Sequence, residues 1–153
     1  MDTKENLIMI AIASDHGGFA MKEDLIAHLK AKGLELEDLG CYSEDSVDYP
    51  VYAEKVCRGI LAGTYERGIL VCGTGIGMSM AANKYPGIRA SLCADCYSAQ
   101  MTREHNDSNV LCLGGRTIGI ELAKMIVDTY LSASFSGLEK HARRIGMFAD
   151  QEK

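Results

Sequence analysis

The chain has 153 residues, 47% of them hydrophobic, and a formal net charge of −5. A chain of this length buries roughly 70% of its unfolded surface, so we expect a single domain over residues 1–153. The acidic balance, without a dominant lysine or arginine cluster, argues against nucleic acid or a membrane surface as a partner, and no apolar run is long enough to span a bilayer.

Strand and helix signals alternate along the whole chain. Short apolar runs bounded by turn residues predict strands, and apolar residues at helical spacing predict helices between them. The predicted strands cover residues 7–13, 34–39, 68–72, 88–93 and 109–113. The predicted helices cover residues 22–32, 52–62, 76–84, 94–104, 118–131 and 137–148.

Four of these strands, all except the second, are apolar at nearly every position, which is typical of parallel strands covered on both faces. The pattern predicts an α/β fold: a three-layer α/β/α, Rossmann-like fold with a five-stranded parallel sheet, plus a C-terminal helix. Ligands bind such sheets beyond the carboxyl ends of the strands. We therefore expect the polar, glycine-rich segments to gather at that edge. They are residues 14–18, 48–50, 72–77, 103–107 and 114–116.

The most informative segment places a cysteine at the head of a glycine loop. An apolar run ends at Cys72, and residues 73–77 supply three glycines and Thr74 before a predicted helix. Backbone N–H groups at a helix start bind anions, stabilise developing negative charge and favour a thiolate. The alternative is that Cys72 is a small buried residue in a tight strand–helix turn.

Histidines accompany two of the other segments. Asp15 and His16 close the first predicted strand, where a simple turn has no special need for a histidine. His105 and Asn106, followed by Asp107, are also explained as the C-terminal cap of a helix. Lone histidines are more often structural than catalytic, so proximity to the glycine loop would decide between the two interpretations.

Basic residues mark two further positions. Arg116 follows two glycines at a predicted helix start, where a cation opposes the helix dipole and suggests an anionic partner. Lys140 and Arg144 lie four residues apart in the last predicted helix and share a face, which suits a phosphate but also an ordinary solvated surface.

The six cysteines favour a reducing compartment. Cys72, Cys93 and Cys112 lie in apolar runs, where a reduced cysteine behaves as a small hydrophobic residue, and we expect a cytoplasmic protein. The C-x-x-C formed by Cys93 and Cys96 has no second pair at zinc-site spacing. We therefore expect neither a metal nor a cofactor.

A nucleotide- or flavin-binding module is an alternative from another functional class. The predicted fold is compatible, and Asp95 lies about 20 residues past Gly75, where a ribose-binding acid is expected. The loop, however, is G-x-G-x-G and follows the third strand, whereas the dinucleotide fingerprint is G-x-G-x-x-G after the first.

Taken together, four motifs resemble the ribose-5-phosphate isomerase B family in order and spacing. They are residues 14–18, 48–50, 72–79 with 81–84, and 105–107 with 109–111. The resemblance implies an isomerase that interconverts D-ribose 5-phosphate and D-ribulose 5-phosphate through an enediolate. It also implies a homodimer or dimer of dimers with shared active sites.

The resemblance implies a role for each candidate residue. Cys72 would be the base, Thr74 and the N–H groups of residues 73–77 would hold the enediolate, and His105 would assist ring opening with Asp15 close by. His105 and its neighbours would reach into the other subunit's site. The implied substrate-binding residues are Asp15, His16, Gly73, Thr74, Gly75, Ile76, Gly77, Asn106, Arg116, Lys140 and Arg144.

One departure from the family concerns the phosphate. Lys140 stands where the family usually has arginine, and lysine holds a phosphate as a point charge rather than with a bidentate fork. Isomerisation of a phosphorylated hexose, allose 6-phosphate or galactose 6-phosphate, is therefore a second possibility within the same reaction class.

Overall fold

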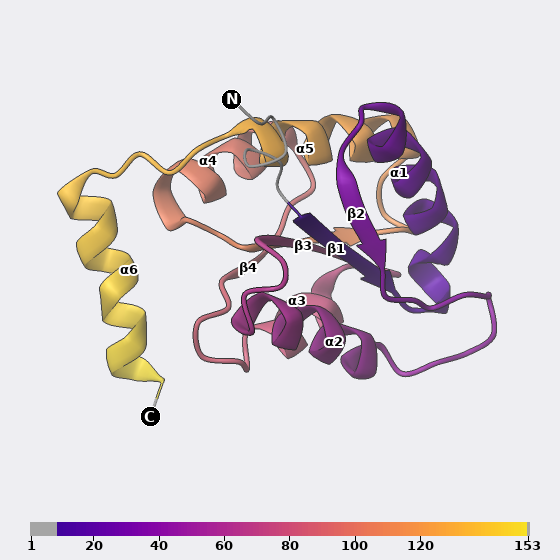
Figure 1. Ribbon diagram of the computed structural model, residues 1–153, viewed down its shortest axis with the longest axis horizontal. Helices are drawn as coiled ribbons and strands as arrows, with labels where there is room; N and C mark the ends of the chain where they lie inside the picture. Colours follow the sequence, from indigo (N-terminus) through magenta and orange to yellow (C-terminus); the bar gives the residue numbers. More distant parts are fainter. Residues whose placement is uncertain (1–8, 153) are drawn as a thin grey trace.

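The computed structural model describes residues 9–152, so the first two residues of the first predicted strand, 7 and 8, lie outside the described residues. Five parallel strands form one sheet in the order β2-β1-β3-β5-β4 (Figure 1). The strands are β1 (Met9–Ser14), β2 (Glu35–Asp38), β3 (Arg67–Cys72), β4 (Ala90–Leu92) and β5 (Val110–Gly114). The helices are a 3-10 turn η2 (His16–Gly18), α1 (Phe19–Ala31), α2 (Tyr49–Leu61), α3 (Ile76–Ala82), α4 (Cys96–Asn106), α5 (Ile120–Ser132) and α6 (Glu139–Gln151).

Helices cover both faces of the sheet, which confirms the predicted three-layer α/β/α fold (Figure 1). Alternate residues of β1 point to opposite faces: Ile10 and Ile12 pack in the core under α1, α4 and α5, while Ala11 and Ala13 pack in the core over α2 and α3. Because both faces are buried, the central strands have the continuous apolar character seen in the sequence.

The direction in which strands are added to the sheet reverses between β1 and β3. The chain leaves β1 through α1 towards β2 on one side, and leaves β3 through α3 towards β4 on the other. Helices therefore diverge from the carboxyl ends of these two neighbouring strands, which is the usual location of a site in an open parallel sheet.

The fourth strand is shorter and more exposed than the predicted strand over residues 88–93, which was expected to be covered on both faces. β4 has only three residues and lies at the sheet edge, with Leu92 42% exposed. The outward-facing N–H and C=O of Ala90 pair with the side-chain amide of Asn83, at 2.9 and 3.0 Å. A side chain thus takes the place of a further strand at this edge.

Helix ends follow local chemistry. Gly33 and Gly63 have φ of +78° and +82° after α1 and α2, as predicted for helix-terminating glycines. α4 continues two residues beyond its predicted end, because Asp107 takes the left-handed conformation at φ +47° and its N–H donates to Thr102 O.

No helix within residues 9–152 combines the length and apolar character required to cross a bilayer.

Candidate active site

Three loops meet at the carboxyl edge of the sheet, where β1 and β3 end side by side. Cys72 ends β3 and is 4% exposed. The N–H of Asp15, just after β1, donates to Val71 O at 3.1 Å, and the N–H of Gly115, just after β5, donates to Cys72 O at 2.8 Å. Residues far apart in the sequence are thus held around the thiol by backbone hydrogen bonds.

The Cys72 thiol lies against the start of α3. Its Sγ accepts a hydrogen bond of 3.1 Å from the N–H of Gly75. Gly75 has φ +79°, and a Cβ there would lie 2.9 Å from the carbonyl carbon of Leu113, so the turn requires glycine. A donor aimed at the sulfur stabilises the thiolate more than the thiol, as a proton-abstracting cysteine requires.

Two of the expected enediolate donors have partners within the loop itself. The N–H of Gly75 is directed at the cysteine sulfur, and the N–H of Ile76 donates to Thr74 Oγ1 at 3.2 Å. Thr74 itself is exposed, so its hydroxyl is accessible to a ligand. The loop therefore serves the thiol as well as any bound oxyanion.

Arg116 brings a positive charge to the same edge. Its backbone N–H donates to Gly73 O at 2.9 Å. A Cβ on Gly17 would lie 3.2 Å from Gly73 N and 3.4 Å from Arg116 Cζ, and a Cβ on Gly73 would lie 3.4 Å from Arg116 Nη1. Glycine at both positions lets the two loops approach each other under the guanidinium group, which is suited to an anion.

Asp15 and His16 lie between these loops, as expected. Asp15 Oδ1 accepts hydrogen bonds from the N–H groups of Gly17 and Gly18, at 2.9 and 3.1 Å, and so caps η2. His16 Nδ1 accepts a hydrogen bond of 3.2 Å from the N–H of Val47. Asp15 therefore has a structural role beside any role in catalysis.

Tyr49 is a residue of this site that the sequence analysis did not assign. It begins α2, and a Cβ on Gly77 would lie 2.6 Å from its ring carbon Cζ. The ring therefore packs directly on the first turn of α3. The available signal was the motif of residues 48–50, which is part of the family resemblance.

The His105 segment is not at this edge, contrary to the expectation that all five polar segments gather there. α4 has 11 residues and runs about 16 Å back along the sheet. At its end, the O atom of Asn106 accepts a hydrogen bond of 3.1 Å from Nε of Arg89, the residue just before β4. His105 and Asn106 thus lie at the amino edge of the sheet, opposite Cys72.

Lys140 and Arg144 also lie away from Cys72, on the His105 side of the molecule. The rings of His105 and His141 stack with centroids 4.3 Å apart. The His141 ring is 8% exposed, and burial, reinforced by the charges of His105, Lys140 and Arg144, lowers its pKa below 6.5. α6 and the end of α4 together form a basic group, which we call the α6 cluster: His105, Lys140, His141 and Arg144.

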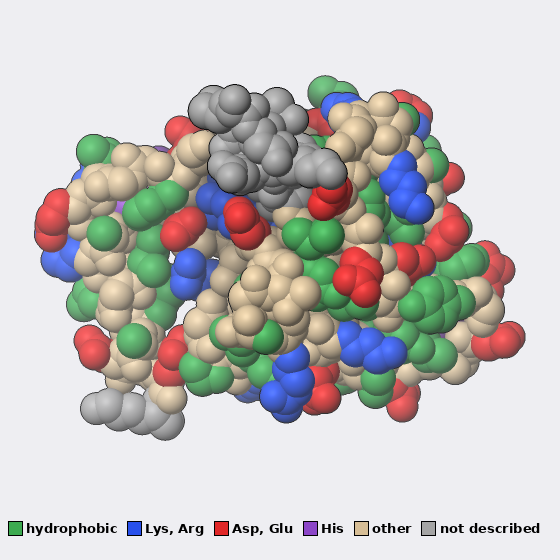
Figure 2. Space-filling model, viewed as in Figure 1, with side chains coloured by type: hydrophobic (Ala, Val, Ile, Leu, Met, Phe, Trp, Pro, Cys, Tyr) green, Lys and Arg blue, Asp and Glu red, His purple; other side chains and the backbone are tan. Residues whose placement is uncertain are grey.

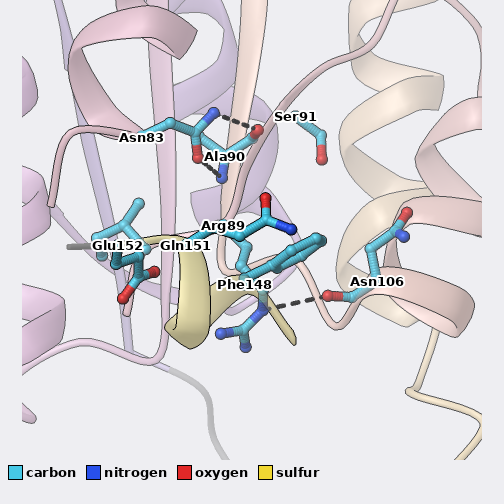
Figure 3. Close-up of a pocket in the computed structure, with 9 residues that line it drawn as sticks. Asn83, Arg89, Ala90, Ser91, Asn106, Phe148, Gln151 and Glu152 are labelled. Atoms are coloured by element: carbon cyan, nitrogen blue, oxygen red, sulfur yellow. Dashed lines mark hydrogen bonds between the residues drawn. The ribbon is translucent and has the colours of Figure 1, made fainter. Parts of the chain in front are cut away.

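A pocket of about 360 Å³ lies next to the α6 cluster rather than at Cys72. It separates the last turn of α6 from the β4 edge, and a hollow beside α6 is visible in the space-filling view (Figure 2). Figure 3 shows Phe148 of α6 facing Arg89 and Asn106 across it. The lining residues are Asn83, Ile88, Arg89, Ala90, Ser91, Asn106, Phe148, Gln151 and Glu152.

The cysteines and acidic residues form no metal centre in the part of the chain that the structure describes: no three His, Cys, Asp or Glu side chains there are grouped to hold an ion. All six cysteines are free thiols. The candidate site thus consists of protein groups in two places, the thiol edge with Cys72, Asp15, His16, Thr74 and Arg116, and the α6 cluster with Asn106 beside it.

Comparison with known proteins assigns the chain to a family. Residues 10–148 match the family model for ribose/galactose isomerase. Ribose-5-phosphate isomerase B from Escherichia coli is 49% identical over 136 residues, covering 89% of this chain and 91% of the relative. Ribose-5-P isomerase B from Listeria innocua is 44% identical over 134 residues, covering 88% and 90%.

Solved structures agree with this assignment. Ribose-5-phosphate isomerase B from Clostridium thermocellum superimposes with a TM-score of 0.93 at 48% identity, covering 95% of this chain and 97% of the other. The enzyme from Thermotoga maritima gives a TM-score of 0.91 at 54% identity, covering 94% and 98%. These findings favour the isomerase over the nucleotide- or flavin-binding alternative, and the chain belongs to the ribose/galactose isomerase family.

Proposed function

We propose that this chain is an aldose–ketose isomerase that interconverts D-ribose 5-phosphate and D-ribulose 5-phosphate, with Cys72 as the base. The observation that carries the proposal is the nearly buried thiol of Cys72, which lies at the carboxyl edge of the sheet with the Gly75 N–H aimed at its sulfur. The names of the relatives in Escherichia coli and Listeria innocua supply the substrate class.

The reaction transfers one carbon-bound proton. The Cys72 thiolate removes the proton from C2 of the open-chain aldose, the electrons of the C2–H bond form the C1–C2 double bond, and the carbonyl oxygen O1 takes up the negative charge. The C2 hydroxyl proton moves to O1, and Cys72 returns its proton to C1 as the ketone forms at C2. A base of matched pKa and oriented donors to the enediolate oxygens are what this step requires.

The remaining roles follow from charge and position at the thiol edge. Thr74 and the loop N–H groups are suited to the enediolate oxygens, and His16 and Arg116 to the phosphate. Binding the phosphate, which does not react, holds C1 and C2 against the sulfur, so that binding energy at one end of the substrate supports chemistry at the other.

A second copy of the chain would complete the site. His105 for ring opening, Asn106 for the sugar, and Lys140 and Arg144 for the phosphate lie at the opposite edge of the sheet from Cys72, so one chain cannot bring them to its own thiol. Apolar side chains on α6 and at its N-cap, those of Met147, Phe148 and Leu138, are exposed and available for a partner. We therefore propose a homodimer or dimer of dimers with shared sites.

Replacing the base tests the proposed chemistry. Cys72→Ala should lower kcat for ribose 5-phosphate about 10³-fold with little change in KM, because the proton-transferring group is lost. Cys96→Ala on α4 is the matched control, since its thiol is also free but lies on another element, and it should keep wild-type kcat. Wild-type turnover by Cys72→Ala would overturn the assignment.

Mixing two inactive variants tests the shared site. Cys72→Ala loses the thiol, and His105→Gln loses the ring-opening group, but a mixed dimer contains one site with both native residues. Activity should return when the two variants are refolded together, and each variant refolded alone is the control. No recovery in a confirmed mixed dimer would contradict the shared site.

We also propose a cytoplasmic location. All six cysteines are unpaired thiols, the state that a reducing compartment maintains.

A further inference from the structure

The contact between Val47 and His16 defines which ring nitrogen of His16 carries a proton. The backbone N–H of Val47 donates to His16 Nδ1 at 3.2 Å. A ring nitrogen can accept only when it has no hydrogen, so in this arrangement the ring proton is on Nε2. Within residues 9–152 no protein group pairs with Nε2, which leaves this N–H available to a ligand.

The surroundings of His16 show what such a donor would meet. The next residue, Gly17, lies against the Gly73 backbone and the Arg116 guanidinium, with a Cβ on Gly17 at 3.4 Å from Arg116 Cζ. Arg116 thus brings a full positive charge to the residue that follows His16. A directed N–H donor beside that charge adds geometry to the binding.

We propose that the backbone N–H of Val47 fixes His16 as the Nε2–H tautomer, so that His16 binds the substrate's phosphate as a directed donor through Nε2 and Arg116 supplies the charge. The inference rests on the proposed function in assigning the phosphate to this edge. Val47 is a positioning residue, since it acts through His16.

The segment that carries Val47 begins at an ion pair with α1. Residues 39–48 link β2 to α2 without regular structure. At the start of this link, the fully buried ammonium group of Lys22 on α1 lies 2.9 and 2.8 Å from the two carboxylate oxygens of Asp38, which is partly exposed, and it also pairs with Glu23 at 2.8 Å. Tyr42 closes over this pair: its ring lies 5.7 Å from Lys22 Nζ, and its hydroxyl donates to Asp38 O at 3.1 Å.

The same ion pair joins the link to the residues before His16. Asp38 Oδ1 accepts a hydrogen bond from the N–H of Gly40 at 2.9 Å, and Gly40 O in turn accepts one from Ser14 at 2.6 Å. The N–H of Cys41 donates back to Ser14 O at 2.9 Å. Because Ser14 is two residues from His16, these hydrogen bonds tie the ion pair and the start of the link to the backbone just before His16. We infer that the Lys22–Asp38 pair helps to position His16 against Val47.

The tautomer of the His16 ring can be measured directly by NMR. In protein labelled with ¹⁵N at histidine, the His16 ring at neutral pH should show the Nε2–H pattern before any ligand is added. Val47→Pro removes the N–H, and Val47→Ala is the matched control that keeps it. Val47→Pro should mix the two tautomers, and should raise both the Kd for inorganic phosphate and the KM for ribose 5-phosphate about tenfold, while kcat stays within about twofold.

The outcomes separate the two proposals. An Nδ1–H pattern in the wild type, or a Val47→Pro variant with unchanged His16 signals and phosphate affinity, would overturn the inference. A wild-type protein with the Nε2–H tautomer but no turnover of ribose 5-phosphate would instead count against the proposed function and leave the tautomer assignment standing.

A second pair of variants isolates the Lys22–Asp38 pair. Lys22→Met with Asp38→Asn removes both charges while the asparagine oxygen can still accept from Gly40. Lys32→Met with Asp128→Asn instead removes an ion pair of 2.7 Å between the C-cap residue of α1 and α5. Both double variants should lower the melting temperature, but only the first should change the His16 ring signals and weaken phosphate binding. Equal effects on stability with no change at His16 in either would rule out the positioning role.

Discussion

The imidazole rings of His105 and His141 stack at 4.3 Å between centroids, with their planes tilted by 32°. This contact joins the end of α4 to the first turn of α6. Ser136 Oγ, 2.7 Å from His141 Nδ1, holds the second ring from the other side. The position of the α6 cluster therefore depends on the His141 ring remaining in contact with His105, and protonation of His141 should disturb it.

The pH dependence of stability tests this contact. Burial, with the positive charges of His105, Lys140 and Arg144, holds the His141 pKa below 6.5 in the folded chain. As pH falls below 6.5, the unfolded chain therefore takes up this proton first, and folded stability falls. His141→Gln should make the melting temperature less sensitive to pH between about 6.5 and about 5. Identical slopes for the two proteins would contradict this.

Asp128 is expected to affect the pH dependence of stability through a lowered carboxyl pKa rather than a lowered imidazole pKa. Burial raises the pKa of its carboxyl, but hydrogen bonds from Lys32 and His28 outweigh burial and hold the pKa below 3.8. Asp128→Asn should lower the free energy of unfolding by about 1 kcal/mol at neutral pH, a value discounted because the side chain is one-third exposed.

That difference should disappear as pH falls through the folded-state pKa, since the wild-type carboxyl is then protonated too. Urea unfolding at neutral pH and near pH 3 measures it. Asp24→Asn on α1 is the control, because Asp24 is also a helical aspartate but is exposed and makes no ion pair within residues 9–152. A neutral-pH effect of Asp24→Asn as large as that of Asp128→Asn would argue against the pair.

Gly63 and Gly75 have nearly the same backbone conformation, so alanine at each position distinguishes the cost of backbone strain from an effect on catalysis. Gly63 and Gly75 have φ of +82° and +79°, but a Cβ on Gly63 meets nothing within 4 Å, whereas one on Gly75 would lie 2.9 Å from the Leu113 backbone. Gly63→Ala should cost about 1 kcal/mol of stability and leave kcat unchanged. Gly75→Ala should cost more and also lower kcat, because the N–H that faces Cys72 Sγ moves.

Urea unfolding and steady-state turnover on ribose 5-phosphate give the two readouts. If Gly63→Ala and Gly75→Ala lost the same stability and had the same kcat, the close contact at Gly75 would have no effect on function, contrary to this prediction.

Lys140 offers a test of how the phosphate end is held. Lys140→Arg should lower the KM for ribose 5-phosphate about threefold, because a guanidinium group can bind two phosphate oxygens at once. It should also raise the preference for ribose 5-phosphate over allose 6-phosphate or galactose 6-phosphate, since a fork fixes the phosphate at one distance from C1. Comparison of kcat/KM on the three sugars measures both effects.

Arg143→Lys is the control on the same helix, because Arg143 is paired with Glu139 at 2.6 Å rather than grouped with His141. A Lys140→Arg variant with wild-type KM and sugar preference would show that this position does not contact the phosphate.

The thiol edge could be predicted from sequence because it follows local rules. An apolar strand ending at Cys72 and glycines before a helix fix the turn, and parallel strands bring the loops after β1, β3 and β5 to one edge. The His105 segment could not be placed in this way. It ends the helix that returns the chain from β4 to the start of the parallel strand β5, so it lies at the amino edge, and Asp107 closes that helix in a left-handed conformation.

Tyr49 and the edge position of β4 were missed for a different reason. The contact of Tyr49 with Gly77 joins residues 28 positions apart, and no local pattern encodes it. β4 has the composition of a buried strand, but β5 inserts between β3 and β4 and leaves β4 at the margin. Strand order is decided by packing of the whole chain rather than by the residues of one strand.

The separation of Cys72 from His105 by the length of the sheet has a kinetic consequence under the proposed function. An isolated folded chain would hold a complete base and no means of opening the sugar ring, so specific activity would depend on the enzyme's own concentration. Dilution below the dissociation constant of the dimer should therefore abolish turnover of cyclic substrate while each chain stays folded. Adding Cys72→Ala chains, which still carry His105, should restore this turnover.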